Sequence, residues 1–224
     1  MPHSAFLSTA LEAAAAAAPD AVLLPKSSTG ADIARATEAL ASAGAPDKTR
    51  LWAMIETPLA ILNVQEIAAA SGRPGARLSC FVMGTNDLVK ETRADLSTNR
   101  RPALYWLSAT VTAARAYGLD VLDGVYNNFK DADGFRRECV HGRALGFDGK
   151  TLIHPDQIAV ANEVFAPPEA EVAFACKIIA AFDRPENGGK GVLTVEGRMV
   201  ELMHAEMARR TVAIAAAIDA MRTA

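Results

Sequence analysis

The stretch RLWAMIETP at residues 50–58 determines the fold that we expect for this chain. Its first six residues are mostly apolar, and Glu56 ends the run just before Pro58. Proline cannot donate a hydrogen bond within a sheet, so a strand here stops at this point. The stretch LSCFVMGTNDL at 78–88 repeats the arrangement and carries Asp87 after its apolar run. Both stretches are typical of buried parallel strands that are followed by polar side chains.

The same pattern recurs along most of the chain. Short apolar segments that predict strands lie at 21–26, 51–56, 78–84, 121–126 and 147–154. Segments of helical composition separate them, at 30–43, 59–71, 102–117 and 133–145. Strands that alternate with helices predict an α/β fold with a parallel sheet.

Polar residues at the ends of the predicted strands recur about once per βα unit. They are Lys26, Glu56, Asp87, Asp123 and His154. In a parallel barrel all the carboxyl ends of the strands open on one face, so these residues converge on one mouth. A closed barrel has eight strands, whereas five are visible before the prolines at 167 and 168. We therefore expect an N-terminally incomplete TIM (β/α)8-type barrel, in which either the chain is truncated or another chain completes the sheet.

The C-terminal quarter of the chain has a different character. We expect a partial barrel over 1–166 that carries the metal site, and a C-terminal helical arm or lid over 167–224. Within this arm we expect a helix at 169–182, a glycine-rich connector at 187–191, an extended piece at 192–200 and a final helix to 221. Glycine-linked elements outside a barrel often close its mouth.

Composition excludes several classes of protein. The formal net charge is -3 and Lys and Arg are scattered, so no basic stripe predicts a nucleic-acid partner. Cys80, Cys139 and Cys176 are far apart and lack a CxxC spacing, which favours reduced thiols and a cytoplasmic location. The alanine-rich segment at 5–18 contains Glu12 and has no basic residues before it, so it predicts a helix, not a signal peptide or membrane span.

Glu56 and Asp87 are the candidate metal ligands. Carboxylates on neighbouring strand ends suit a hard divalent cation that keeps waters and takes substrate oxygens. The alternatives are a salt bridge at the strand end for Glu56 and a helix N-cap for Asp87. Glu56 and Asp87 follow successive predicted strands, and this spacing favours a shared metal ion.

Several motifs occur in the same order as in a known family. They are LLPK at 23–26, MIET at 54–57, MGTNDL at 83–88, LDGVY at 122–126, GFDGK at 146–150, IHPDQ at 153–157 and GRMV at 197–200. In these motifs the chain resembles the citrate lyase β-subunit and malyl-CoA lyase family, within the HpcH/HpaI aldolase superfamily of CoA-ester lyases. The resemblance implies a TIM barrel, Mg²⁺ held by Glu56 and Asp87, and a carbon–carbon bond cleaved or formed between an acyl-CoA and a 2-oxo acid.

The resemblance also implies roles for other residues. Members of the family carry an Asp after the GRMV motif that acts as an acid–base group in a neighbouring subunit, and here the residue is Glu201. The alternative is an ordinary acidic residue near the start of the final helix. Asp123 is either a catalytic residue that orients a metal-bound water or a cap for the loop after its strand. An arginine and an acidic motif from early barrel strands of the family are absent from this sequence.

Lys26, Lys150 and His154 are the candidate contacts to the substrate and CoA. Lys26 ends its strand at the barrel mouth, and the motifs of the other two resemble part of the wall beside CoA in the family. Lys150 is expected either to meet a CoA phosphate or to extend to solvent. His154 has the alternative of a hydrogen-bonded structural histidine.

The leading function is a lyase that acts on malyl-CoA or β-methylmalyl-CoA, rather than citryl-CoA, to give glyoxylate and acetyl- or propionyl-CoA. A malyl-CoA thioesterase is the hydrolytic alternative. A third possibility is an inactive truncated homologue or a partner subunit. From the resemblance, we expect a homotrimer or a homohexamer.

Overall fold

The computed structural model describes residues 2–223, with side chains from residue 9 onward. The chain forms two compact units, Met1–Ala161 and Asn162–Ala224. The division falls within helix α8 (Asp156–Phe165), a few residues before the boundary expected at 166.

A five-stranded parallel sheet forms the centre of the first unit, and its strands lie side by side in chain order. The strands are β1 (Ala21–Leu24), β2 (Arg50–Ile55), β3 (Leu78–Met83), β4 (Asp120–Asp123) and β5 (Gly149–Lys150). All five occur where the sequence predicts them, although β4 and β5 are shorter than the predicted segments. The α/β class with a parallel sheet is therefore confirmed.

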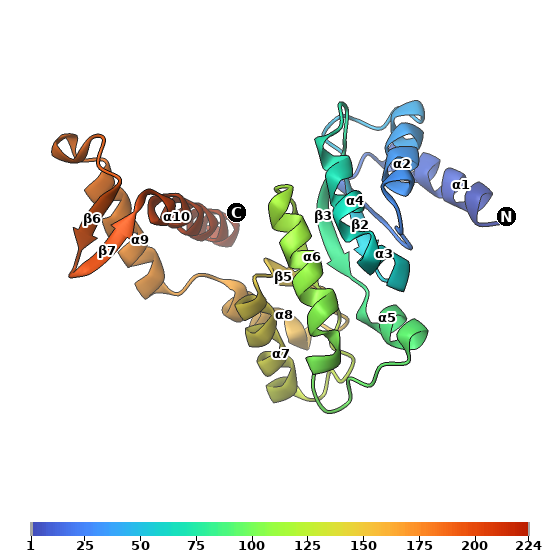
Figure 1. The fold of residues 1–224 in the computed structure, drawn as a ribbon. Coiled ribbons are helices and arrows are strands. Elements are labelled where there is room, and N and C mark those ends of the chain that lie inside the picture. Colours follow the sequence, from blue (N-terminus) through green and yellow to red (C-terminus); the bar gives the residue numbers. More distant parts are fainter. Residues whose placement is uncertain (1, 224) are drawn as a thin grey trace. The chain divides into compact units, whose positions relative to one another are not determined.

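Helices connect successive strands and form one layer beside the sheet (Figure 1). They include α2 (Gly30–Ser42), α4 (Val64–Ala69), α6 (Leu104–Ala116) and α7 (Ala132–Leu145), and each contacts the next. The remaining helices of the unit are α1 (Pro2–Ala17), α3 (Pro58–Leu62), η1 (Ala70–Gly72), α5 (Thr85–Thr92) and η2 (Arg101–Ala103). Right-handed crossovers between parallel strands place such helices on one side of a sheet.

The helix predicted over 59–71 is interrupted at Asn63. This residue ends α3 and begins α4, and its side-chain nitrogen donates to the carbonyl oxygen of Ser28 at 3.0 Å. An amide side chain that bonds to a distant backbone group competes with continuation of the helix. Helices α5 and α8 were not predicted, because each begins directly after a motif that we interpreted as a strand end.

The two faces of the sheet differ in how well they are covered. Leu51, Ala53 and Ile55 alternate along β2 and are fully buried. The opposite face carries Trp52 and Met54, which are half-buried. Leu23 belongs to this second face, since it pairs with Trp52, and it is 39% exposed. The second face is the one that points inward in a barrel, and in this chain it is incompletely covered.

The second unit has a small core of its own. Its elements are α9 (Glu169–Phe182), η3 (Pro185–Asn187), β6 (Val192–Val195), β7 (Arg198–Glu201) and α10 (Leu202–Thr223). The core side chains are Ala175, Ile178, Val195, Val200, Ala205 and Ala208. The predicted single extended piece is an antiparallel hairpin instead. Its turn residues Glu196 and Gly197 have φ of 50° and 77°, the positive values that a two-residue hairpin turn requires.

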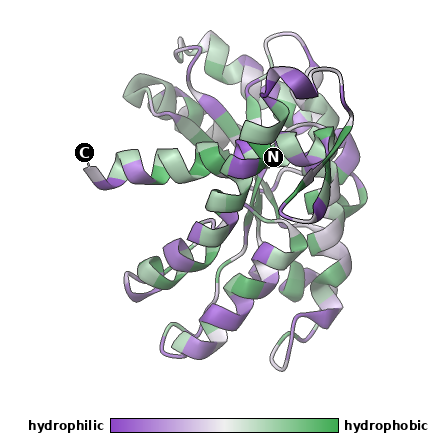
Figure 2. Cartoon of the chain, turned by 90° about the vertical axis from the view of Figure 1, so that its left-hand side faces the viewer, coloured by the Kyte–Doolittle hydropathy of each residue, from purple (hydrophilic) through white to green (hydrophobic). Residues whose placement is uncertain are grey.

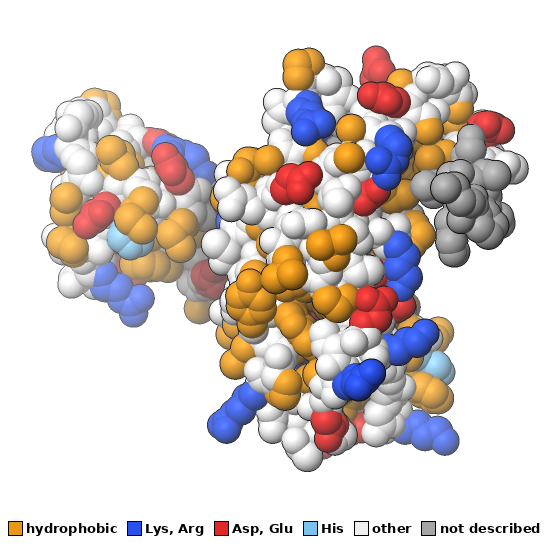
Figure 3. Space-filling model, turned by 45° about the vertical axis from the view of Figure 1, so that its right-hand side comes forward, with side chains coloured by type: hydrophobic (Ala, Val, Ile, Leu, Met, Phe, Trp, Pro, Cys, Tyr) orange, Lys and Arg blue, Asp and Glu red, His pale blue; other side chains and the backbone are white. Residues whose placement is uncertain are grey.

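The surface carries a mixture of charged and apolar side chains, as the scattered Lys and Arg residues of the sequence indicate. The helices in Figure 2 combine hydrophilic and hydrophobic stretches, as amphipathic helices do. On the face drawn in Figure 3, positively and negatively charged side chains are intermixed, with apolar ones between them. Among residues 2–223, no helix has the length and apolar character that crossing a bilayer demands.

Replacement of Phe81 tests the core of the first unit. Phe81 on β3 is completely buried, so Phe81→Ala should lower the free energy of unfolding by about 3–5 kcal/mol. Phe129→Ala is the matched control, because Phe129 is 42% exposed, and it should cost about 1 kcal/mol or less. Urea denaturation followed by tryptophan fluorescence measures this, since Trp52 and Trp106 both lie in the first unit. Equal losses in the two variants would contradict the burial of Phe81.

Candidate functional site

Glu56, Asp87 and Lys26 meet at the carboxyl ends of β1, β2 and β3. The backbone nitrogen of Lys26 donates to Oε1 of Glu56 at 2.7 Å, and its Nζ donates to Oδ1 of Asp87. Both carboxylates thus share Lys26 as a hydrogen-bond partner. Three of the residues predicted from the strand ends are therefore neighbours in the structure.

Gly84 makes room for Glu56. Glu56 directly follows β2, and Gly84 directly follows the neighbouring strand β3. A Cβ atom on Gly84 would lie 2.3 Å from the Cβ of Glu56, a distance that atoms of the two residues cannot adopt without a backbone shift. The absence of a side chain at 84 therefore lets Glu56 lie over the end of β3, toward Asp87.

The electrostatics of the three groups follow from their burial. Glu56 is only 4% exposed, and burial raises the pKa of its carboxyl, while the hydrogen bond from Lys26 opposes this. Asp87 lies nearer to solvent, and the Lys26 ammonium lowers its pKa. The same contact raises the pKa of Lys26. At neutral pH the ammonium thus offsets part of the negative charge that two adjacent carboxylates create.

These residues suit a magnesium ion. Mg²⁺ is commonly held by one or two carboxylates, with water and substrate oxygens filling the other positions. Glu56 and Asp87 supply such a pair, and burial is the main cause of the raised pKa of Glu56. Among the described residues, no cluster of three or more His, Cys, Asp or Glu residues could hold a metal ion. Two carboxylates would leave the other coordination positions to water and substrate oxygens.

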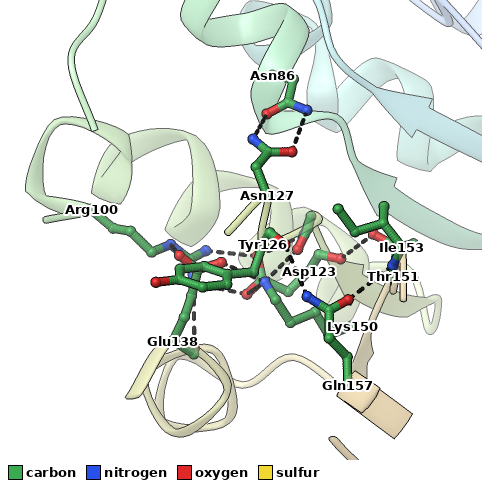
Figure 4. Close-up of polar contacts among 11 residues, drawn as sticks. Asn86, Arg100, Asp123, Tyr126, Asn127, Glu138, Lys150, Thr151, Ile153 and Gln157 are labelled. Atoms are coloured by element: carbon green, nitrogen blue, oxygen red, sulfur yellow. Dashed lines mark hydrogen bonds and ion pairs between the residues drawn. The ribbon is translucent and has the colours of Figure 1, made fainter. Parts of the chain in front are cut away.

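Asp123 and Lys150 belong to a buried ionic cluster instead of the mouth (Figure 4). Asp123 receives two hydrogen bonds from Arg100, at 2.8 and 2.6 Å, and one from Lys150 Nζ at 3.1 Å. Lys150 also donates to Glu138 at 2.6 Å. Neither the Asp123 nor the Lys150 side chain is exposed to solvent.

This burial changes the expectation for both residues. Lys150 was expected to reach a CoA phosphate or solvent, but its ammonium is enclosed by Asp123, Glu138 and the carbonyl of Gly124. The Asp123 carboxylate also accepts from the backbone nitrogen of Gly124 at 2.8 Å, which is the loop-capping alternative. Both side chains lie on the sheet face that the helices cover, as the contact of Asp123 with Gly142 of α7 indicates. Both side chains are thus enclosed within the chain, and the catalytic role of Asp123 and the CoA contact of Lys150 stay predictions.

Sequence reasoning missed Arg100 and Glu138. Arg100 lies in a loop without periodicity, and its partner Asp123 is 23 residues away. Glu138 looks like an ordinary acidic residue of an amphipathic helix. The one available signal was the charged Lys150 within an apolar strand motif, since a buried charge requires partners of opposite sign.

His154 belongs to the first unit and Glu201 to the second. The His154 ring stacks on Phe129 with centroids 4.6 Å apart, and both line a cavity of about 500 Å³ together with Phe135 and Gln157. Its Nδ1 accepts from the backbone nitrogen of Asp156 at 3.3 Å. Glu201 ends β7 in the second unit. The substrate role of His154 and the acid–base role of Glu201 stay predictions.

The fold and the carboxylate site together define a class of protein. Residues 2–155 match the HpcH/HpaI aldolase/citrate lyase family, and the chain belongs to this family of CoA-ester-processing enzymes. A (3S)-malyl-CoA thioesterase from Cereibacter sphaeroides (ATH 2.4.1) is 50% identical over 95% of this chain and 70% of its own length. The citrate lyase subunit beta of Escherichia coli K12 is 34% identical over 85% of this chain and 64% of its own length.

Solved structures agree with the assignment. CitE from Mycobacterium tuberculosis, in complex with magnesium, acetoacetate and coenzyme A, superposes with a TM-score of 0.64 and 29% identity. The match covers 87% of this chain and 68% of that one. The chain thus spans about two thirds of the length of the relatives that it matches. The TIM-barrel type of fold expected from the sequence is confirmed.

Removal of the Lys150 charge tests the buried cluster. Lys150→Met leaves Asp123 and Glu138 with one cation fewer in a region without solvent, and should lower the free energy of unfolding by about 3–5 kcal/mol. Lys48→Met is the matched control, because Lys48 pairs with Asp20 at an exposed site. Exposed pairs contribute about 0–1 kcal/mol. Urea denaturation gives both values, and a Lys150 variant as stable as the control would contradict the cluster's burial.

Proposed function

We propose that this protein is a magnesium-dependent enzyme acting on a malyl-CoA-type thioester, with Glu56 and Asp87 as the metal ligands. The observation that carries the proposal is that both carboxylates contact the same residue, Lys26, beyond the carboxyl ends of neighbouring strands. Active sites of parallel barrels lie at this end of the strands. The names of the relatives support the substrate class, since they include malyl-CoA and citrate enzymes.

The residues of this chain divide the work as follows. When bound, Mg²⁺ supplies Lewis-acid polarisation of substrate oxygens. Glu56 is held in place by the backbone of Lys26 and by the space above Gly84, so its carboxylate is oriented before a metal arrives. The Lys26 ammonium is 53% exposed and stays protonated at neutral pH, so it can also donate to an anionic substrate group. Orientation in advance of binding is what a catalytic metal site requires.

Hydrolysis of the thioester is the first candidate reaction. The relatives that are about half identical to this chain are named (3S)-malyl-CoA thioesterases, whereas the citrate lyase relative is 34% identical. Hydrolysis yields free CoA and malate. This ranking reverses the expectation from sequence motifs, in which cleavage of the carbon–carbon bond came first.

Carbon–carbon cleavage is the second candidate, because the family includes lyases of CoA esters. The same two carboxylates would serve either reaction, since the metal site determines where substrate oxygens bind and not which bond is attacked. In the lyase reaction the products are glyoxylate and acetyl-CoA. Glu201, as an acid–base group contributed to a neighbouring subunit of a homotrimer or homohexamer, belongs to this proposal.

Conservative amides at the two carboxylates test the metal assignment. Glu56→Gln and Asp87→Asn should each weaken Mg²⁺ binding by more than about tenfold, because neutral amide oxygens attract a hard cation less strongly. Isothermal titration calorimetry with MgCl₂ measures the dissociation constant directly. Glu91→Gln is the matched control, since Glu91 is an exposed carboxylate near Lys26, and it should bind Mg²⁺ as the unchanged chain does. Unchanged binding by Glu56→Gln would remove the basis of the proposal.

A product assay separates the two reactions. With (3S)-malyl-CoA and Mg²⁺, we expect free thiol and malate in equal amounts and no glyoxylate. Thiol is measured with a chromogenic disulfide, and glyoxylate as its hydrazone. Glyoxylate that matches substrate consumed would establish the lyase instead, and Glu56→Gln should abolish whichever product forms.

A further inference from the structure

The first turn of α5 and the loop after β4 are joined by a reciprocal amide contact. Nδ2 of Asn86 donates to Oδ1 of Asn127 at 3.1 Å, and Nδ2 of Asn127 donates to Oδ1 of Asn86 at 2.7 Å (Figure 4). Asn86 lies in the first turn of α5, next to Asp87, and Asn127 lies in the loop after β4. Each amide satisfies the other with a donor and an acceptor, so the contact defines the orientation of both side chains.

The backbone beside this contact is also tightly packed. A Cβ atom on Gly124 would lie 2.7 Å from Oγ1 of Thr85 and 3.0 Å from the carbonyl oxygen of Met83. The loop after β4 therefore lies directly against the residues that lead into α5. Glycine at 124 permits this close packing, and the Asn86–Asn127 contact continues it along the loop as far as Asn127.

The loop after β4 is anchored by the buried cluster. Lys150 Nζ donates to the carbonyl oxygen of Gly124, and Gln157 Nε2 donates to that of Tyr126 at 2.9 Å. Asp123, which begins the loop, is held by Arg100 and Lys150. Charges that have no access to solvent keep their partners, because separating them would leave an ion unpaired. The loop is thus a fixed surface against which α5 can be held.

Asp87 needs such a support. Its carboxylate is 38% exposed, and the side chain of its partner Lys26 is 53% exposed, so this ion pair alone constrains it weakly. Helix α5 has eight residues, and its N-cap residue, Gly84, provides no side-chain cap. A short helix without a cap has little rigidity of its own.

We propose that Asn86 and Asn127 are positioning residues that hold Asp87 for metal binding, with the buried Arg100–Asp123–Lys150–Glu138 cluster as their anchor. This inference rests on the proposed metal role of Asp87. In this proposal, neither amide contacts the metal. Both act by setting where the Asp87 carboxylate lies relative to Glu56.

Magnesium titration of the full chain by calorimetry tests the inference. Asn127→Ala and Asn86→Ala should each weaken Mg²⁺ binding by about tenfold, as loss of supporting contacts around metal ligands commonly does. The double variant should bind no more weakly than either single variant, because one shared contact can be lost only once. Asn128→Ala is the matched control, an exposed asparagine in the same loop, and it should leave the affinity unchanged. Both amides are exposed, so the melting temperature should stay constant throughout.

The outcomes separate this inference from the proposed function. Normal Mg²⁺ binding by Asn127→Ala, together with loss of binding in Glu56→Gln, would overturn the positioning role and leave the metal site standing. Effects of the two single variants that multiply in the double variant would likewise overturn it, since the residues would then act separately. Unchanged binding in Glu56→Gln would overturn the proposed function, and the positioning role with it.

Discussion

Ile55 pairs with Met83 in the parallel register of β2 and β3, and this pairing places the residues after each strand beside one another. Glu56 therefore lies next to Gly84, where only a residue without a side chain leaves it room, and it shares Lys26 as a partner with Asp87, one helical turn further on. Burial of Glu56 makes its charge costly, so the site favours a cation close by. The Lys26 ammonium supplies part of the positive charge that stabilises the two carboxylates, and a divalent metal ion would supply more.

A second cluster of charged residues is centred on Asp123 of β4 and Lys150 of β5, the next two strands of the sheet. Arg100, Asp123, Lys150 and Glu138 contribute two positive and two negative charges, and the Asp123 and Lys150 side chains are fully buried. Buried ion pairs add little net stability compared with apolar packing, but breaking one is costly. Here the ion pairs fix geometry, because they hold the loop after β4 in one place. A fixed loop at this position is what the proposed metal site requires, because the geometry of such a site depends on the residues that support it.

The sequence predicted the class of fold and the carboxylate pair because both depend on local order. Apolar runs of strand length, each followed by polar residues, are visible without knowledge of the fold, and parallel strands must bring their ends together. The break at Asn63 and the hairpin turn at 196–197 escaped prediction, since one depends on the distant carbonyl of Ser28 and the other on backbone angles. Lys150 was expected near solvent because its motif does not reveal which side of the strand it faces.

By itself, then, the sequence determined the βα order, the family motifs and the placement of Glu56 and Asp87 on neighbouring strand ends. Only the tertiary structure decided which charged residues face the mouth and which are enclosed beneath it. The reason is that burial of a charge depends on partners from other elements. Arg100 comes from a loop and Glu138 from a helix, and they reach Asp123 and Lys150 across 23 and 12 residues respectively. Such pairings arise from packing, and no local pattern records them.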